Sequence, residues 1–166
     1  MKSKYHFAKK VPTKSQLKTA VEETDDVKGH FKEGIKAVEG RYRNKFVVPD
    51  SWKLTGSIDI DSATKEKYFE DNRWDYAIEY DGETFFVEIH PGSTSEVETV
   101  ILKLNWLKKW LNIKAPKIKA LQPRNKKAFY WLFTNRFAIL PTSKQYKRLS
   151  LQGIVPQGQW VYNEIK

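Results

Sequence analysis

The chain of 166 residues contains no cysteine and only three histidines. The lack of cysteine excludes disulfide scaffolds, thiolate zinc sites, cysteine nucleophiles and CxxC redox chemistry. No run of about 18 apolar residues occurs, so the sequence offers no candidate membrane span. The opening residues, MKSKYHFAKKV, lack the apolar core of a secretory signal. We therefore expect a cytoplasmic protein that has no membrane partner.

Several motifs of common enzyme classes are also missing. The sequence has neither the G-x-x-x-x-G-K-[ST] nor the G-x-G-x-x-G pattern of phosphate-binding loops. It has no G-x-S-x-G elbow, and none of its histidines has an evident serine partner. Carboxylate oxygens and a few imidazoles are therefore the main side-chain groups left for chemistry.

What the sequence has in excess is positive charge, +10 at neutral pH, and this charge is unevenly placed. Residues 99–163 contain 13 lysines and arginines and no acid, whereas residues 50–98 contain 13 acids and four bases. Nucleic acids reward clustered cations by releasing condensed counterions. The distribution therefore predicts a nucleic-acid partner, and a solvated basic face that only aids solubility is the alternative.

Length and apolar patterning predict one α/β domain at residues 15–166, after a basic, frayed or loosely docked segment at residues 1–14. Helical spacing of apolar residues predicts helices over residues 27–38, 97–111 and 143–152, and residues 15–23 have a weakly helical pattern. Apolar and alternating runs predict strands over residues 53–60, 73–80, 84–90, 128–134 and 159–165. The order α-β-β-β-α-β-α-β predicts a mixed β-sheet flanked by helices.

Two acidic residues lie inside predicted strands that form a hairpin. Asp81-Gly82 is the strongest turn signal in the sequence, and a turn there places Asp75 directly opposite Glu88. Their Cβ atoms would be about 4.5–5.5 Å apart on one face of the sheet, where like charges repel. A cation between them would relieve the repulsion, and hard oxygen donors suit Mg²⁺ or Mn²⁺. Such an ion can polarise a phosphate and activate water.

The alternative is that these acids simply face solvent on a sheet exposed on one side. We expect that role for Glu79, Asp81 and Glu83, which surround the same turn. Asp59 and Asp61, at the end of the first predicted strand, could add a metal ligand or serve a turn.

An acid on one strand, an acid-x-base triplet closing the next, and a basic strand-helix-strand tail resemble the PD-(D/E)XK nuclease superfamily. The resemblance covers roughly residues 15–165 as an order of elements, and its motif consists of Asp75, Glu88 and the third residue of Glu88-Ile89-His90. It implies a restriction-endonuclease-like fold and metal binding by Asp75 and Glu88. It also implies that a lysine in the third position orients or activates the attacking water.

His90 departs from that pattern because it stands where the family has lysine. A neutral imidazole can accept a proton from water near pH 7, although a structural histidine at a strand end is the alternative. In some family members a lysine from the following helix replaces the missing one, and Lys103 is the first lysine there. Lys103 either reaches inward or faces water, and the sequence slightly favours water. The resemblance also makes helix-borne glutamates candidates, namely Glu23, Glu33 and Glu39.

The basic residues after this helix form the predicted nucleic-acid surface. Pro116 and Pro123 indicate a stiff, exposed connection that follows a phosphate backbone without reading bases. Among the tryptophans, we expect at most one to stack on an unpaired base. The predicted phosphate-binding residues are Lys108, Lys109, Lys114, Lys117, Lys119, Arg124, Lys126, Lys127 and Arg136.

These observations together predict a metal-dependent nuclease that hydrolyses phosphodiester bonds of DNA. Asp75, Glu88, His90 and Lys103 are its candidate catalytic residues, and Mg²⁺ or Mn²⁺ its cofactor. The first alternative is a non-catalytic nucleic-acid-binding or regulatory protein on a degenerate nuclease fold. A weaker one is a protein-binding module whose oppositely charged halves provide complementarity.

Overall fold

The computed structural model describes residues 14–162, so the predicted N-terminal segment lies outside it apart from Lys14. The α-helices are α1 (Gln16–Glu22), α2 (Ile60–Thr64), α3 (Val97–Ile113), α4 (Pro116–Lys119) and α5 (Lys144–Leu151). The strands are β1 (Lys32–Glu33), β2 (Phe46–Val47), β3 (Leu54–Asp59), β4 (Tyr76–Tyr80), β5 (Glu83–His90), β6 (Phe129–Phe133), β7 (Ile154–Gln157) and β8 (Trp160–Val161). None of the helices in this part of the chain has the length and apolar character needed to cross a bilayer.

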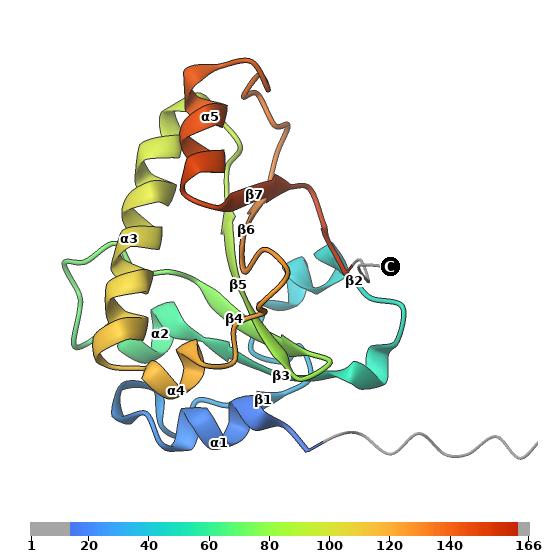
Figure 1. Ribbon diagram of the computed structural model, residues 1–166, viewed down its shortest axis with the longest axis vertical. Helices are drawn as coiled ribbons and strands as arrows, with labels where there is room; N and C mark the ends of the chain where they lie inside the picture. Colours follow the sequence, from blue (N-terminus) through green and yellow to red (C-terminus); the bar gives the residue numbers. More distant parts are fainter. Residues whose placement is uncertain (1–13, 163–166) are drawn as a thin grey trace, which may run out of the picture.

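A mixed sheet of six strands in the order β1-β3-β4-β5-β6-β7 organises the molecule (Figure 1). Strands β1, β3, β4 and β5 pair antiparallel, whereas β5, β6 and β7 pair parallel. Helix α3 connects β5 to β6, and α5 connects β6 to β7, as parallel pairing requires. The predicted α/β class with helices flanking a mixed sheet is therefore confirmed.

Alternation along the strands divides the apolar residues between two faces of the sheet. Phe86 of β5 and Ala77 of β4 belong to the cluster that contains α1 and α3 residues such as Leu104. Their neighbours Val87 and Ile78 belong to a second cluster on the other face. Because Asp75 and Glu88 share the parity of Ala77 and Phe86, they face the helices and not open solvent.

The hairpin that positions the two acids has the predicted register. Tyr80 pairs with Glu83, and the pairing continues without a shift to Tyr76 and Val87. The turn residues Asp81 and Gly82 have φ angles of 50° and 79°. A two-residue hairpin turn with positive φ at both positions matches the twist of the strands, which explains why an Asp-Gly pair fixes this register.

The predicted helix over residues 27–38 is wrong. Gly29 and Gly34 have φ angles of 81° and 58°, which no α-helix accommodates, and the segment instead forms turns and the short strand β1. The strand predicted over residues 159–165 is β8, which pairs with β2 in a separate small sheet, and its last residues lie outside the described range. The pattern missed four further helices and strands: α2, α4, β2 and β7.

Candidate functional site

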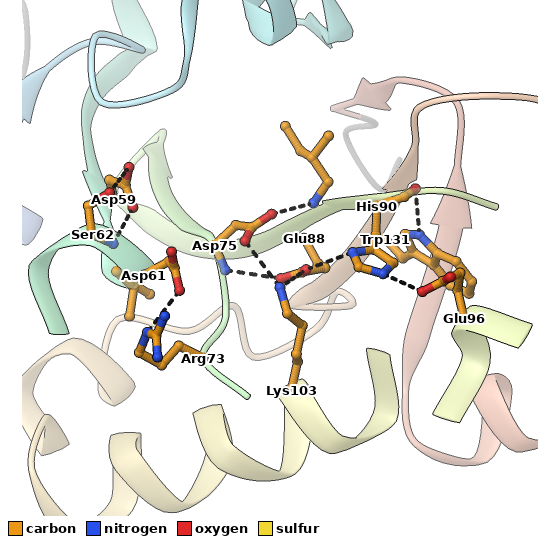
Figure 2. A network of polar contacts seen from close by, with 12 residues as sticks. Asp59, Asp61, Ser62, Arg73, Asp75, Glu88, His90, Glu96, Lys103 and Trp131 are labelled. Carbon is orange, nitrogen blue, oxygen red and sulfur yellow. Dashed lines mark hydrogen bonds and ion pairs between the residues drawn. The ribbon is translucent and has the colours of Figure 1, made fainter. Parts of the chain in front are cut away.

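The side chains of Asp75 and Glu88 each accept a hydrogen bond from the backbone of the other strand segment (Figure 2). Asp75 lies just before β4, and its backbone N–H donates to Glu88 Oε2 at 3.0 Å. In return, the N–H of Ile89 donates to Asp75 Oδ2 at 2.9 Å. The predicted juxtaposition of the two carboxylates is therefore confirmed, and each keeps a second oxygen for other partners.

Lys103 of α3 supplies the positive charge at this site. Its Nζ lies 3.3 Å from Asp75 Oδ1 and also forms an ion pair with Glu88 Oε1. The expectation that favoured a solvent-facing Lys103 is wrong, since only 16% of its side chain is exposed. Its neighbours Val100, Leu104 and Leu107 are buried against the sheet, and this packing brings the flank of α3 over the two acids.

Burial and repulsion perturb the protonation of this trio. Burial raises the pKa of Glu88 well above its ordinary value, and the charge of Asp75 raises it further. Burial also raises the pKa of Asp75, against the attraction of Lys103. Burial alone would lower the pKa of Lys103, but the two carboxylates outweigh it and raise that pKa. The lysine thus stays charged, and Glu88 is the group most easily protonated.

His90 lies at the end of β5, and its imidazole is placed between the carboxylates of Glu88 and Glu96. Its Nε2 is 2.5 Å from Glu96 Oε2, and its Nδ1 is 3.6 Å from Glu88 Oε1. The carbonyl oxygen of His90 accepts a hydrogen bond from Trp131 Nε1 at 3.1 Å, which fixes the backbone. Glu96 therefore orients the imidazole as an acidic partner orients a histidine base.

No sequence pattern singles out Glu96, which lies six residues beyond His90 in the 3₁₀ turn Thr94–Glu96. The only available signal was Pro91-Gly92, which ends the strand and turns the chain back toward it.

The other candidate metal ligands have structural partners. Asp59 caps α2 by accepting from the N–H of Ser62 at 2.8 Å, and Asp61 pairs with Arg73 at 2.9 Å. Among the predicted helix-borne candidates, Glu23 pairs with Lys117, Glu39 pairs with Arg41, and Glu33 is exposed on β1. These residues do not join the trio formed by Asp75, Glu88 and Lys103.

Glu79, expected to face solvent, is buried with 1% of its surface exposed. It accepts hydrogen bonds from the backbone N–H groups of Gln16 and Leu17 at 2.8 and 3.2 Å and from the hydroxyls of Ser15 and Thr55. Glu79 therefore anchors the first turn of α1 to the sheet, which is why it tolerates burial.

Only part of the predicted nucleic-acid surface lies near Asp75 and Glu88. Lys126 pairs with Glu83 at the first residue of β5, five residues before Glu88, which corresponds to about 17 Å of strand. The connection before it contains α4, and Lys117 of α4 pairs with Glu23. Lys108 donates to the carbonyl of Gln152.

The remaining predicted phosphate-binding residues are exposed, and none of them forms an ion pair with another residue in the range 14–162. Arg136 lies beyond the carboxyl end of β6, next to the carboxyl end of β5 that carries Glu88 and His90. The N–H of Thr134, two residues before Arg136, donates to the carbonyl of His90. The other exposed residues are distributed between α3 and the segment that leads to β6: Lys109, Lys114, Lys119, Arg124 and Lys127.

The two strand-borne acids could hold a hard divalent cation together with solvent and substrate. Within the described residues, no group of three or more His, Asp or Glu side chains could hold a metal ion on its own. Mg²⁺ commonly binds one or two carboxylates, keeps several waters and adds substrate phosphate oxygens. The donor set of Asp75 and Glu88 fits that mode, in which the ion competes with the Lys103 ammonium.

Comparisons with protein-family models, with curated proteins and with solved structures gave no match to this chain. The geometry of the site is therefore the basis on which a function can be assigned.

Proposed function

We propose that the protein is a metal-dependent nuclease that hydrolyses phosphodiester bonds of DNA. The observation that carries the proposal is the position of Lys103, whose ammonium lies against both Asp75 and Glu88. His90 carries no permanent positive charge, and Lys103 from the following helix supplies that charge instead. The antiparallel run β3-β4-β5, followed by α3 and the parallel strand β6, supports a restriction-endonuclease-like arrangement.

Each residue of the site has a distinct role in this proposal. Asp75 and Glu88 would bind Mg²⁺ or Mn²⁺, which when bound polarises the scissile phosphate and lowers the pKa of attacking water. Lys103 provides positive charge for the phosphoryl oxygens as negative charge develops on them. His90 accepts the proton of the attacking water through Nδ1, because Glu96 engages Nε2 at 2.5 Å. Arg136, at the same sheet edge, binds the phosphate backbone.

A second function, nucleic-acid binding without cleavage, is favoured by the same ion pairs. Lys103 already compensates part of the charge of both carboxylates, so a divalent ion must displace its ammonium. The raised pKa of Glu88 adds a proton as a further competitor. In this case the basic residues bind the polyanion, and the trio of Asp75, Glu88 and Lys103 is only structural.

Cleavage assays separate the two functions. Supercoiled plasmid and single-stranded DNA are incubated with the protein in Mn²⁺ or in EDTA, alongside Glu88→Gln and Lys103→Met. We expect metal-dependent cutting that falls at least about 100-fold in either variant. Glu83→Gln is the matched control, since Glu83 lies on the same strand but pairs with Lys126. Binding without cutting by the folded wild-type protein would establish the second function and refute the first.

A further inference from the structure

A small cavity of about 180 Å³ lies between α3 and the segment that follows α2. Its walls include three aromatic side chains, Tyr68, Trp106 and Trp110, and two basic ones, Lys109 and Lys114. Pockets for drug-sized ligands have volumes of about 300–1,000 Å³, so this cavity has room for one ring system and not for a whole nucleotide.

Two of the three aromatic walls, Tyr68 and Trp110, are held in place by a shared carboxylate. Asp26 accepts hydrogen bonds from Trp110 Nε1 at 3.0 Å and from the Tyr68 hydroxyl at 2.7 Å. Trp106 stacks on Trp110 with ring centroids 5.8 Å apart and planes within 8°, and Tyr68 meets Trp106 edge-on at 5.6 Å. Trp110 is buried, whereas Trp106 is half-buried and lines the cavity. The Trp106 ring, packed against two other rings, is thus a rigid platform that loses little entropy when a ligand stacks on it.

The charges around the cavity suit an anionic chain attached to a planar ring. Lys109 and Lys114 are exposed, and neither takes part in an ion pair within residues 14–162. Asp71 also lines the cavity. Its carboxylate repels phosphate but can accept a hydrogen bond from the exocyclic amine of a base.

The cavity is on the same side of α3 as the proposed catalytic lysine. Trp106 follows Lys103 by three residues, and side chains at that spacing are neighbours on a helix surface. Trp110 follows one turn later, so the stripe from Lys103 to Trp110 rises about 10 Å along the helix. A strand whose phosphate lies at Lys103 can therefore place a nearby base at Trp106.

We infer that this cavity binds an unpaired nucleobase, so that the substrate is a nucleic acid with a single-stranded segment. The status of this nucleic acid as a substrate rests on the proposed function, because only a nuclease would cleave it; binding of the base does not require cleavage. The base stacks on Trp106, and the flanking phosphates bind Lys109 and Lys114. A base inside a duplex is already stacked and paired, and its extraction costs a few kcal/mol. The protein therefore prefers single strands or unpaired ends over intact duplex.

Binding in EDTA tests the inference without any cleavage. Affinities for a labelled single-stranded oligonucleotide and for its duplex are measured for the wild type, Trp106→Leu and Trp106→Phe. Stacking is worth about 1–3 kcal/mol per base, so Trp106→Leu should weaken single-strand binding about 5- to 150-fold. Trp106→Phe should retain most of it, and duplex affinity should stay the same in both variants. Phe69→Leu is the matched control, because Phe69 is exposed beside Tyr68 and does not line the cavity.

A second measurement covers the case in which Trp106→Leu fails to fold. Lys109→Gln with Lys114→Gln should reduce the salt dependence of single-strand binding by about 1.4 in the log–log slope, for two phosphates. Equal affinity of the wild type for both oligonucleotides, or an unchanged affinity of folded Trp106→Leu, would overturn the inference and leave the nuclease proposal intact. Stacking-dependent binding without metal-dependent cutting would sustain the inference while the nuclease proposal fails.

Discussion

Two glutamates on one face of the β4–β5 hairpin are buried in opposite circumstances. Glu79 is 1% exposed and Glu88 is fully buried. The carboxylate of Glu79 accepts four hydrogen bonds, including two from the N–H groups that open α1. Glu88 faces the carboxylate of Asp75 and depends on the ammonium of Lys103 for compensation. A buried acid is therefore not evidence of function by itself; what distinguishes Glu88 is a like charge held beside it.

The difference has a thermodynamic consequence. Burial and Asp75 raise the pKa of Glu88 in the folded protein above its ordinary value of 4.5. A group with a raised folded pKa contributes stability that is complete below the ordinary value and is lost as the pH rises through the folded pKa. Glu88 therefore costs folding stability at neutral pH, which is typical of a residue kept for chemistry.

Matched substitutions should give the largest contrast. Glu79→Met leaves two backbone donors of α1 without an acceptor, and we expect the free energy of unfolding at pH 7 to fall by about 3–5 kcal/mol. Glu88→Met removes a disfavoured charge and leaves Asp75 paired with Lys103, but the N–H of Asp75 loses its acceptor, so the loss should stay within about 1–2 kcal/mol. Urea denaturation followed by circular dichroism measures both.

The pH dependence of the same variants provides the control. The stability of the wild type should decline above about pH 4.5 through the titration of Glu88, and Glu88→Met should remove that part of the decline. A loss of stability in Glu88→Met as large as that in Glu79→Met would show that both acids are structural anchors.

Binding of a divalent cation should depend on Glu88, which lies beside Asp75, and this would distinguish Glu88 from Glu79. Mn²⁺ at 100 times its dissociation constant should stabilise the wild type by about 2.7 kcal/mol, because it binds the folded site and not the unfolded chain. Thermal unfolding with Mn²⁺ and with EDTA measures the shift. Glu88→Met should abolish it, and an equal shift in that variant would place the ion elsewhere.

Removing the lysine tests the compensation directly. Lys103→Met leaves Asp75 and Glu88 without their cation, and we expect a loss of about 2 kcal/mol at pH 8. The loss should shrink toward pH 5, because both carboxylates have raised pKa values and become protonated. Denaturation at the two pH values measures this. Mn²⁺ should stabilise the variant more than the wild type, since no ammonium competes, and a pH-independent loss would contradict the account.

The smallest effect concerns the partner of His90. Glu96→Gln should lower the rate of DNA cleavage about tenfold, or about 1.4 kcal/mol in the barrier, with KM unchanged, because the imidazole is oriented less well. Steady-state cleavage kinetics measure it. Glu98→Gln is the control, because Glu98 lies two residues away and pairs with Arg148 on the surface. Identical rates in the two variants would assign Glu96 a structural role.

Local signals were sufficient to predict the hairpin and the long helix. The Asp81-Gly82 turn fixes the register, and the register brings Asp75 to Glu88. The error over residues 27–38 has a local cause, because two glycines with positive φ break an apolar spacing that otherwise suits a helix. The turn of α4 has no such apolar pattern, since it begins at Pro116 and lies within the basic connection.

The partners of the site residues could not be predicted, because they depend on contacts between distant segments. Glu79 is buried by α1, more than 60 positions earlier, so the alternation of β4 cannot reveal its role. The inward direction of Lys103 depends on how α3 packs on the sheet, and a helical pattern alone leaves either orientation open. The position of the basic residues relative to the acids likewise follows from the parallel pairing of β5 and β6.

The negative charges of the site lie on the sheet, whereas its balancing cation lies on α3 (Figure 2). During synthesis the hairpin that carries both acids leaves the ribosome before Lys103 does. Any chemistry that needs all three groups must then wait until α3 has docked. For the proposed nuclease, this order means that a nascent or partly unfolded chain would not cut nucleic acid before the helix has docked.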